Sequence, residues 1–491
     1  MVPICAVASL AVLCGACELS GPRQKREIAP AVLFVQKPSA GGDAQAQADG
    51  SVARPFPSLR AALAAAPEGA LLRLEEGVYR ESLQITRPVV LLGKGVGRTR
   101  IVAPAGSAST VEVRADRVEM YGVSIEGGGT CAVFYGGAHR LRRVELRGCA
   151  KAGLSARRAR VEILSSTIVD VSGGEEGRGI DLDGGLLDAR GVALRFAGRR
   201  AVVLHGARGL LEDVTVQEST LSALQATDGA DVRVVRGDYE GRAGAALYAG
   251  GAHLAVDGAR VRHGEYAVLG YRGAELSVRG SELTDYSVAA VAMVNSHGSV
   301  ERVTIARGGT DAAISVTRAD GKKPVLLADN RISRPGTMGV HVTESSVTAR
   351  GNIITGATLD AEGDMGDAFY AVDSRLVIEQ NVLRGNAGSG VAAVRSTVRL
   401  RGNGFIGNGR AGVLLLDASR GTATGNTFAG NHKAGVELVE RSSARLDGNR
   451  FGGIGPLDVD AGCGRGEGGK TQIGSGNLAM AGRLRQRTCP E

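Results

Sequence analysis

Hydrophobic residues along most of the chain occur in short stretches in which alternate positions are apolar. Val398 and Leu400 are separated by a single residue, and Val413 and Leu415 have the same spacing. This period of two is typical of a β-strand, because successive side chains of a strand point to opposite faces. The longer amphipathic runs of helical repeats are absent. The pattern predicts an all-β protein made of many short strands.

These stretches belong to a repeat. Residues 376–394, 398–416 and 422–439 align with one another, and Gly-Val pairs recur in register. One asparagine series has intervals of 22 or 23 residues and a single interval of 29, and comprises Asn330, Asn352, Asn381, Asn403, Asn426 and Asn449. A second comprises Asn386, Asn408 and Asn431. Repeats of this length indicate a solenoid whose units stack on one another.

The repeat and the strand pattern together predict a single right-handed parallel β-helix, with three short strands in each coil. Successive coils would stack at the strand spacing of about 4.8 Å. Asn tolerates left-handed backbone at a turn, and its amide can bond the next Asn in the stack. The first asparagine series is therefore interpreted as a structural ladder rather than a sugar-binding site.

Composition and charge agree with a solenoid and exclude one class of function. The 491 residues include 74 Gly but no Trp, 8 Phe and 9 Tyr, so few aromatic side chains are available for a thick globular core. The balance of 59 basic against 51 acidic residues gives a net charge of +8. No basic run is interleaved with aromatic residues, which argues against a nucleic-acid partner.

The beginning of the chain predicts export. Residues 4–15 form an apolar stretch too short to cross a bilayer, and the following "LCGAC" resembles a bacterial lipobox with Cys17 as the acylated residue. An ordinary cleaved signal peptide is the alternative. We expect a lipoprotein signal peptide at 1–17, a flexible tether with one short strand at 18–50, the β-helix at 51–452 and a C-terminal cap at 453–491. The predicted location is the bacterial cell envelope, in the periplasm or at the outer membrane.

Four cysteines follow the predicted anchor, and an even number in an exported chain permits disulfides. Cys131 and Cys149 lie close to one coil apart, so a bridge between neighbouring coils is geometrically reasonable. Cys463 and Cys489 could join within the C-terminal tail. Neither pair has the CxxC spacing of a zinc site, and no metal site is predicted from the cysteines.

Residues 55–103, from "PFPSLRAALAAAPEG" through "EGVYRESLQI" and "PVVLLGKG", resemble the opening of the pectin-lyase-like β-helix superfamily. The similarity is closest to its NosD-like and carbohydrate-binding repeat proteins and extends to about residue 452. It implies a short helix at 57–66 that caps the first coil. Because the superfamily includes lyases, hydrolases, esterases, epimerases and non-enzymes, the resemblance specifies the fold and not the activity.

Polysaccharide-cleaving β-helices need clustered carboxylates, and the strings typical of pectin hydrolases are absent. Two long coils carry insertions at 317–324 and 358–370, and such loops often have functional roles. Aligning inward residues of successive coils places Ser315, His341, Tyr370 and Ala392 in one outward column and Arg318, Glu344, Asp373 and Arg395 in a second. An acidic loop with Asp360, Glu362, Asp364 and Asp367 lies beside them.

This region is the predicted ligand site. A sugar would stack on Tyr370 and bond with Arg318, Arg395, Asp364 and Asp367, while His341, Glu344 and Asp373 are the candidate catalytic groups. No cofactor is predicted, although the acidic loop could bind Ca²⁺. The alternative is cross-strand pairing of surface charges and a solvated loop. The acidic stretch at 175–183 is a second candidate of the same kind.

Two functions are consistent with these features. The first is a non-catalytic envelope β-helix that binds polysaccharide or serves as an interaction scaffold for an envelope protein, held at the membrane by its lipid anchor. The second is a polysaccharide lyase, hydrolase or epimerase with an atypical site on the face formed by residues 318–395. Convergence of Glu344, Asp373 and His341 in a cleft would favour the enzyme. A third role, as an accessory protein in metal maturation, has no Met-rich or His-rich string in its favour.

Overall fold

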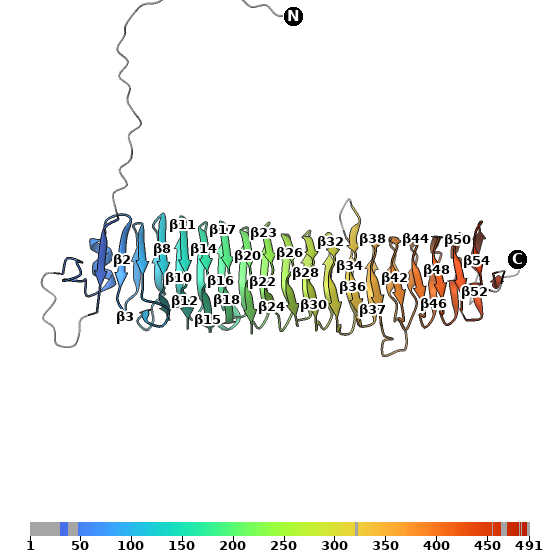
Figure 1. The fold of residues 1–491 in the computed structure, drawn as a ribbon, viewed down its shortest axis with the longest axis horizontal. Helices are drawn as coiled ribbons and strands as arrows, with labels where there is room; N and C mark the ends of the chain where they lie inside the picture. The colour runs from blue at the N-terminus through green and yellow to red at the C-terminus, as the bar shows by residue number, and fades with distance from the viewer. Residues whose placement is uncertain are drawn as a thin grey trace, which may run out of the picture.

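The computed structural model describes residues 30–37, 48–319, 323–453, 455–462, 469–480, 482 and 484–488. These residues form one straight rod of stacked coils, with the first coils at one end and the last at the other (Figure 1). The predicted signal peptide with Cys17 lies outside the described residues, as do Cys463 and Cys489.

Each coil contributes one strand to each of three parallel sheets, so the predicted all-β solenoid is confirmed. Sheet A has 19 strands and extends from β1 (Val32–Val35) to β53 (Lys470–Ile473). Sheet B extends from β3 (Gly77–Arg80) to β54 (Leu478–Ala479). Sheet C extends from β4 (Leu83–Ile85) to β55 (Gln486–Thr488). The chain passes from A to B to C, and the three turns of each coil form the A–B, B–C and C–A corners.

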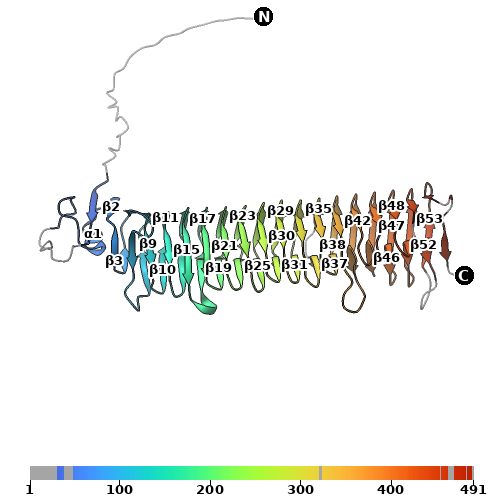
Figure 2. The same ribbon diagram turned by 60° about the horizontal axis from the view of Figure 1, so that its bottom comes forward.

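A short helix covers the first end of the rod, as the resemblance implies (Figure 2). Helix α1 (Leu59–Ala65) begins after Ser58, whose hydroxyl accepts a hydrogen bond from the Ala61 backbone. Two further N–H groups of its first turn donate to the carboxylate of Glu81, and Arg87 donates to two carbonyls at its C-terminal end. Both ends of the helix are therefore satisfied by side chains of the first coils. No helix in the described part of the chain has the length and apolar character needed to cross a membrane.

The core is formed by inward side chains stacked in columns. Ile314 pairs with Val340, Val340 with Phe369 and Phe369 with Val391, which is the register that the repeat predicts. Because the backbone spacing of a parallel sheet is fixed, like side chains in neighbouring coils come into direct contact. Rings of Phe405, Phe428 and Phe451 stack in this way, with centroids 4.9 and 4.8 Å apart.

Asparagines occupy the buried A–B corner in consecutive coils. The side-chain oxygen of Asn403 accepts from both the backbone N–H and the amide of Asn381, at 2.9 and 3.1 Å. The Asn403 amide in turn donates to the oxygen of Asn426 and to the Ile378 carbonyl. The same bonds recur from Asn330 to Asn477, so each buried amide is satisfied by the next one.

The other two corners carry ladders of their own in the C-terminal half of the rod. Asn386, Asn408 and Asn431 bond in series at the B–C corner. Serines occupy the C–A corner, where the backbone N–H of one donates to the hydroxyl of the next, from Ser345 through Ser374 and Ser396 to Ser419. All three corners of these coils are therefore fixed by buried polar side chains.

The coils continue past residue 452, where the sequence predicts the start of a cap. Strands β52 (Leu457–Ala461), β53, β54 and β55 pair in parallel with the preceding coil. Asn477 extends the asparagine ladder beyond Asn449. The connection between β52 and β53 lengthens this coil, so the interval to Asn477 exceeds the usual spacing and the repeat is not recognised in the sequence.

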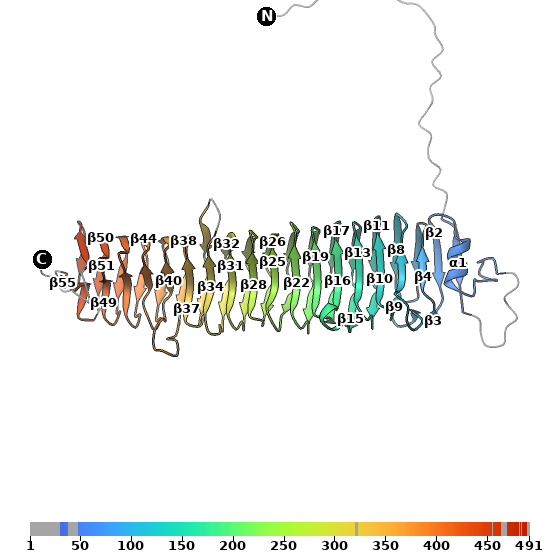
Figure 3. The ribbon, with the colours of Figure 1, turned by 180° about the vertical axis from the view of Figure 1, so that it is seen from behind.

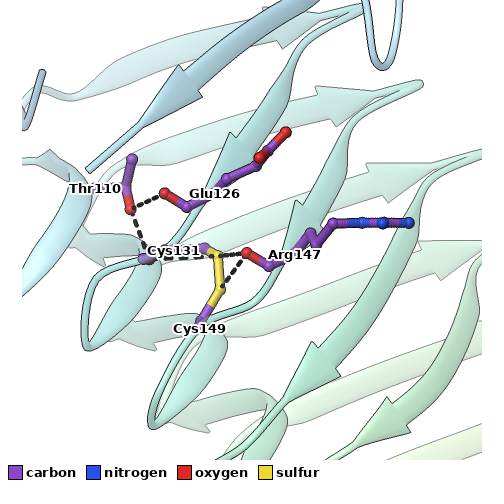
Figure 4. The surroundings of a disulfide bond; sticks show 6 residues. Thr110, Glu126, Cys131, Arg147 and Cys149 are labelled. Atoms are coloured by element: carbon purple, nitrogen blue, oxygen red, sulfur yellow. Dashed lines mark hydrogen bonds between the residues drawn. A yellow bond between two sulfur atoms is a disulfide. The ribbon is translucent and has the colours of Figure 1, made fainter. Parts of the chain in front are cut away.

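Cys131 and Cys149 form a disulfide between neighbouring coils (Figure 4). Both cysteines are fully buried: Cys149 lies at the B–C corner, between β12 (Glu145–Arg147) and β13 (Ala152–Arg157), and Cys131 lies near the start of β10 (Thr130–Tyr135) in sheet C. The bond links two coils that the sheets already hold in register. It therefore fixes the stacking of coils near the capped end of the rod.

The asparagine ladder leads to a prediction about stability. Asn403→Ala removes the acceptor of two donors on Asn381 and the donor to the Ile378 carbonyl. Because these groups stay buried without partners, the free energy of unfolding should fall by about 3 kcal/mol. Urea denaturation measures the change. Thr422→Ala, at an exposed position of sheet A, is the control. A loss for Asn403→Ala no larger than that of the control would contradict the role of the ladder.

Candidate functional site

The two insertions lie at different corners of the rod. Residues 318–324 connect β34 (Ala312–Thr317) in sheet C to β35 (Val325–Ala328) in sheet A. Residues 356–368 connect β39 (Ile353–Thr355) in sheet B to β40 (Phe369–Val372) in sheet C. The described residues that flank the first insertion and the loop at 356–368 lie at opposite edges of the rod in Figures 1 and 3. The predicted ligand set is therefore divided, with Arg318 and Arg395 at the C–A corner and Asp364 and Asp367 at the B–C corner.

The predicted outward column lies on sheet C between these corners. Ser315 pairs with His341, His341 with Tyr370 and Tyr370 with Ala392. The His341 and Tyr370 rings lie 5.7 Å apart and are tilted by 51°. Burial lowers the pKa of His341 and raises the pKa of Tyr370, so both side chains are neutral near pH 7. Together they form a neutral aromatic pair at the surface.

The second predicted column follows the C–A corner, and ion pairs join its last two members, Asp373 and Arg395, and extend to Asp417. Arg318, Glu344, Asp373 and Arg395 all have left-handed backbone at equivalent turns. Arg395 donates to both oxygens of Asp373, at 2.8 and 3.0 Å, and to Asp417 in the next coil. These hydrogen bonds lower the pKa of Asp373. Asp373 is therefore an ionised partner of an arginine, as the cross-strand alternative predicts.

The three candidate catalytic groups do not meet in a cleft. His341 lies on β37 (Met338–Thr343), whereas Glu344 lies three residues farther on at the turn. Three residues of a strand span roughly 10 Å, which is too far for a shared proton. The hydroxyl of Thr343, and not a carboxylate, contacts Nε2 of His341 at 3.1 Å. The arrangement does not assemble an acid, a base and a substrate position.

The acidic loop folds on itself at its tip. The Asp360 backbone donates to the carbonyl of Asp364, and the Asp360 carboxylate accepts from the Asp364 backbone at 2.7 Å. In the described ranges no three His, Cys, Asp or Glu side chains group in a way that could hold a metal ion. The described residues of the loop therefore add no support for the predicted possibility of Ca²⁺ binding.

Asp367, at the base of this loop, has an unusual environment. Its side chain is buried and accepts a hydrogen bond from the Ser389 backbone at 2.5 Å. Burial raises the pKa of Asp367 to about 7, against the opposing effects of the Ser389 bond and the charge of Arg410. Arg410 itself is held by two 3.0 Å bonds to Glu437. Asp367 therefore titrates near neutral pH, and it lies at the B–C corner, whereas the candidate catalytic residues Glu344 and Asp373 lie at the C–A corner.

The most extensive feature of sheet C, a long uncharged surface, was not expected from the sequence. We call it the neutral face: the outward side chains from β22 (Ser222–Thr227) to β46 (Ala411–Leu416). None of these positions carries a charge, and they comprise Gln225, Thr227, Tyr248, Gly250, Leu269, Tyr271, Ala292, Val294, Ser315, Thr317, His341, Thr343, Tyr370, Val372, Ala392, Val394, Leu414 and Leu416. At about 4.8 Å per strand the neutral face is roughly 40 Å long.

Charged side chains mark both limits of the neutral face. On the N-terminal side, β19 (Arg200–His205) begins with Arg200, and in the coil before it Arg178 and Asp181 form an ion pair on β16 (Arg178–Asp183). On the C-terminal side, Glu437 on β49 (Ala434–Leu438) bonds with Arg410 and Lys433. Sheet A, by contrast, carries ion pairs such as Arg279 with Glu301 along the same coils. Comparing outward columns sheet by sheet in the sequence would have revealed the difference.

Comparison with known families agrees with this architecture. A family model described as "right handed beta helix region" matches residues 289–451. This segment is a right-handed β-helix. No curated protein sequence matches the chain significantly.

Several solved structures with similar folds act on or bind polysaccharides. The catalytic domain of a GH87 α-1,3-glucanase, solved with tetrasaccharides, is 12% identical over 84% of this chain, with a TM-score of 0.30. The chain spans 64% of the length of that domain. The A-module of an Azotobacter vinelandii mannuronan C-5 epimerase is 13% identical, with coverage of 84% and 91% and a TM-score of 0.24. A pectin methylesterase in complex with a hexasaccharide is 11% identical, with coverage of 60% and 92% and a TM-score of 0.23. At these sequence identities and TM-scores, the structural similarity gives no information about the activity of this chain.

Titration of Asp367 gives a testable dependence of stability on pH. Its pKa is raised from 3.8 to about 7 in the folded chain, so the folded state holds the proton more tightly than the unfolded state between these values. Stability should therefore fall as pH rises from about 4 to about 7, by up to about 4 kcal/mol for the full shift, of which about 3 kcal/mol is lost above pH 5. Asp367→Asn, which keeps an oxygen acceptor for Ser389, should flatten this dependence.

Thermal unfolding between pH 5 and pH 8 measures the effect. Asp373→Asn is the control, because the pKa of Asp373 is lowered and its contribution to stability is lost only at more acidic pH. If Asp367→Asn leaves the pH dependence of the unfolding midpoint unchanged, Asp367 does not titrate near neutral pH.

Proposed function

We propose that the chain is an exported, lipid-anchored protein of the bacterial envelope that binds a polysaccharide along the neutral face without cleaving it. The observation that carries the proposal is the uninterrupted row of uncharged outward side chains on sheet C, in which Tyr248, Tyr271 and Tyr370 are partly exposed. Sheets normally protect such a surface with charges, because an exposed apolar face favours association. Its retention over many coils therefore supports a binding role.

The chemistry of the neutral face suits a carbohydrate chain. Tyrosine presents an apolar ring for the C–H face of a sugar and a hydroxyl for hydrogen bonds. The ring of Tyr271 also lies 5.1 Å from the guanidinium of Arg272, which places a donor at the edge of the face. Thr317, Thr343 and Gln225 add polar groups between the rings. A polymer lying along the rod would meet these contacts at intervals along the face.

Export is supported by two independent features. The apolar segment and Cys17 are typical of a lipoprotein signal, and the buried Cys131–Cys149 disulfide suits an oxidising compartment such as the periplasm. The tether that follows Cys17 would connect the anchor to the capped end of the rod. The neutral face would then extend away from the membrane attachment point.

A second candidate function, cleavage or epimerisation of a polysaccharide, has one observation in its favour. Asp367 is a carboxyl group with a pKa of about 7 three residues before Tyr370, which lies on the neutral face. A general acid requires such a pKa. The partner base is not assembled, because Asp373 is held by Arg395 and Glu344 lies at the opposite corner. Binding without cleavage is therefore the function that the geometry supports better.

Binding by the neutral face can be tested with a panel of neutral and acidic polysaccharides on an array, using the chain without its first 29 residues. We expect binding to a neutral glycan that is insensitive to salt, because no charged groups lie on the face. The triple variant Tyr248→Ala, Tyr271→Ala, Tyr370→Ala should weaken binding at least tenfold, at roughly 0.5–1.5 kcal/mol for each lost stacking contact.

Tyr121→Ala, on the outward side of sheet A, is the matched control and should leave glycan binding unchanged. Release of reducing ends from a polysaccharide by the unmodified chain would show cleavage and would favour the enzyme hypothesis. Equal affinities of the triple variant and the unmodified chain would refute binding on the neutral face.

Lipid anchoring has its own test. The full chain, produced in a bacterial host supplied with radiolabelled palmitate, should incorporate label and fractionate with membranes. Cys17→Ser should remove the label, because this thiol is the predicted acylation site, whereas Cys14→Ser should retain it. Incorporation that persists in Cys17→Ser would show that Cys17 is not the lipid attachment site.

A further inference from the structure

A second surface, on the C-terminal half of sheet B, differs from the rest of that sheet. Earlier coils carry ion pairs on their outward side, such as Arg100 with Glu126 at 2.6 Å and Arg262 with Asp238 at 2.9 Å. From β36 (Arg331–Ser333) onward, the described outward positions of sheet B carry no acidic residue. The charged residues at these described positions are Arg331, Arg384 and Arg450.

Large apolar side chains are exposed between these arginines. Ile406 is 42% exposed, Leu478 59% and Met480 84%. They line a hollow of about 720 Å³ over the last coils of sheet B, and Ile406 also borders an adjoining hollow of about 460 Å³ that reaches Arg334 and Arg384. The two hollows form one groove parallel to the rod axis, which we call the sheet B groove. Exposed apolar patches rimmed by polar residues commonly mark interaction sites.

The depth of the sheet B groove comes from the adjacent B–C corner. One left-handed position recurs there, and several middle coils fill it with side chains such as Phe196, Asp285 and Arg307 at φ of 50°, 60° and 57°, whereas Gly127 and Gly148 occupy it near the start of the rod. In the last coils the position is glycine, at Gly356, Gly385, Gly407, Gly430 and Gly453. A Cβ at Gly385 or Gly407 would meet no atom within 4 Å. Other residues adopt the same backbone conformation in other coils, so the turns themselves do not require glycine. The effect of the glycines is to leave the wall of the groove open.

We infer that the sheet B groove binds an acidic segment of a partner protein, with apolar side chains, laid along the rod axis. Charge complementarity selects the occupant: Arg334, Arg384 and Arg450 border the groove, and none of them pairs with an acidic group in the described part of the chain. The exposed apolar side chains are aliphatic, whereas Phe428 and Phe451 are buried, so the groove offers no ring for a sugar to stack on. The arginines and the aliphatic side chains follow the rod axis over successive coils, as an extended peptide segment would.

The dimensions define the partner segment. The strands from β36 to β54 span roughly 30 Å at about 4.8 Å per step, which an extended peptide of about nine residues would cover. Alternating acidic and apolar side chains would face the arginines and the aliphatic floor in turn. This site is independent of glycan binding, because it lies on a different sheet from the neutral face.

Fluorescence anisotropy with three labelled ten-residue peptides tests the inference on the chain without its first 29 residues. The first peptide alternates Asp with Leu, the second Lys with Leu, and the third Asp with Ser. We expect only the Asp/Leu peptide to bind, and to bind more weakly at high salt because the arginine contacts are screened. Leu478→Asp with Met480→Asp should weaken its binding at least tenfold, and so should Arg384→Glu with Arg450→Glu.

Thr422→Asp and Arg401→Glu, at exposed outward positions of sheet A, are the controls and should bind like the unmodified chain. If the Leu478→Asp, Met480→Asp variant has a lower unfolding midpoint, the peptide affinity of the Arg384→Glu, Arg450→Glu variant decides the test. Absence of Asp/Leu binding, or affinities of both double variants equal to that of the unmodified chain, would overturn the inference. Two other occupants are tested in parallel, an anionic membrane with phosphatidylglycerol vesicles and a second copy of the chain by sedimentation velocity. If the double variants abolish either of these interactions and the Asp/Leu peptide does not bind, the inference is overturned.

Discussion

The structure depends on the fixed spacing of its coils. Residues at equivalent positions of neighbouring coils lie about 4.8 Å apart. A buried side chain must therefore be compatible with the side chain that stacks on it in the next coil. An isolated buried amide would lose its hydrogen bonds to water, but a column of asparagines satisfies each amide with its neighbour, as Asn403 does with Asn381 and Asn426. The phenylalanine stack at the same coils follows the same requirement with ring contacts.

This constraint applies to the interior and leaves the outward positions free to differ from sheet to sheet. Ion pairs recur on the outward side of sheet A, as Arg140 with Glu162 and Arg279 with Glu301 illustrate. Sheet C is uncharged over its middle coils, and the C-terminal part of sheet B is aliphatic with a border of arginines. Since all three surfaces are supported by the same core, each one can acquire a binding role without disturbing the fold.

The interior was predictable from the sequence because its spacing is regular. The register of Ile314, Val340, Phe369 and Val391 and the asparagine positions follow directly from the repeat. The last coil was missed because a longer connection separates Asn449 from Asn477. The candidate site was predicted less well, since a repeat specifies which residues share a column but not which corner an insertion leaves. The loops at 318–324 and 356–368 therefore could not be placed on opposite sides of sheet C in advance.

Regular spacing also favours binding over catalysis on sheet C. Catalysis requires several different groups to converge on one point, whereas a stacked sheet places neighbouring groups in parallel rows at constant separation. Here the acids that could converge are either paired, as Asp373 is with Arg395, or displaced to a corner, as Asp367 is. A row of equivalent shallow contacts suits a polymer with its own repeat, because many weak contacts on one chain act together. The neutral face has this form, with Tyr248, Tyr271 and Tyr370 spread along its length and no single cleft between them in the described coils.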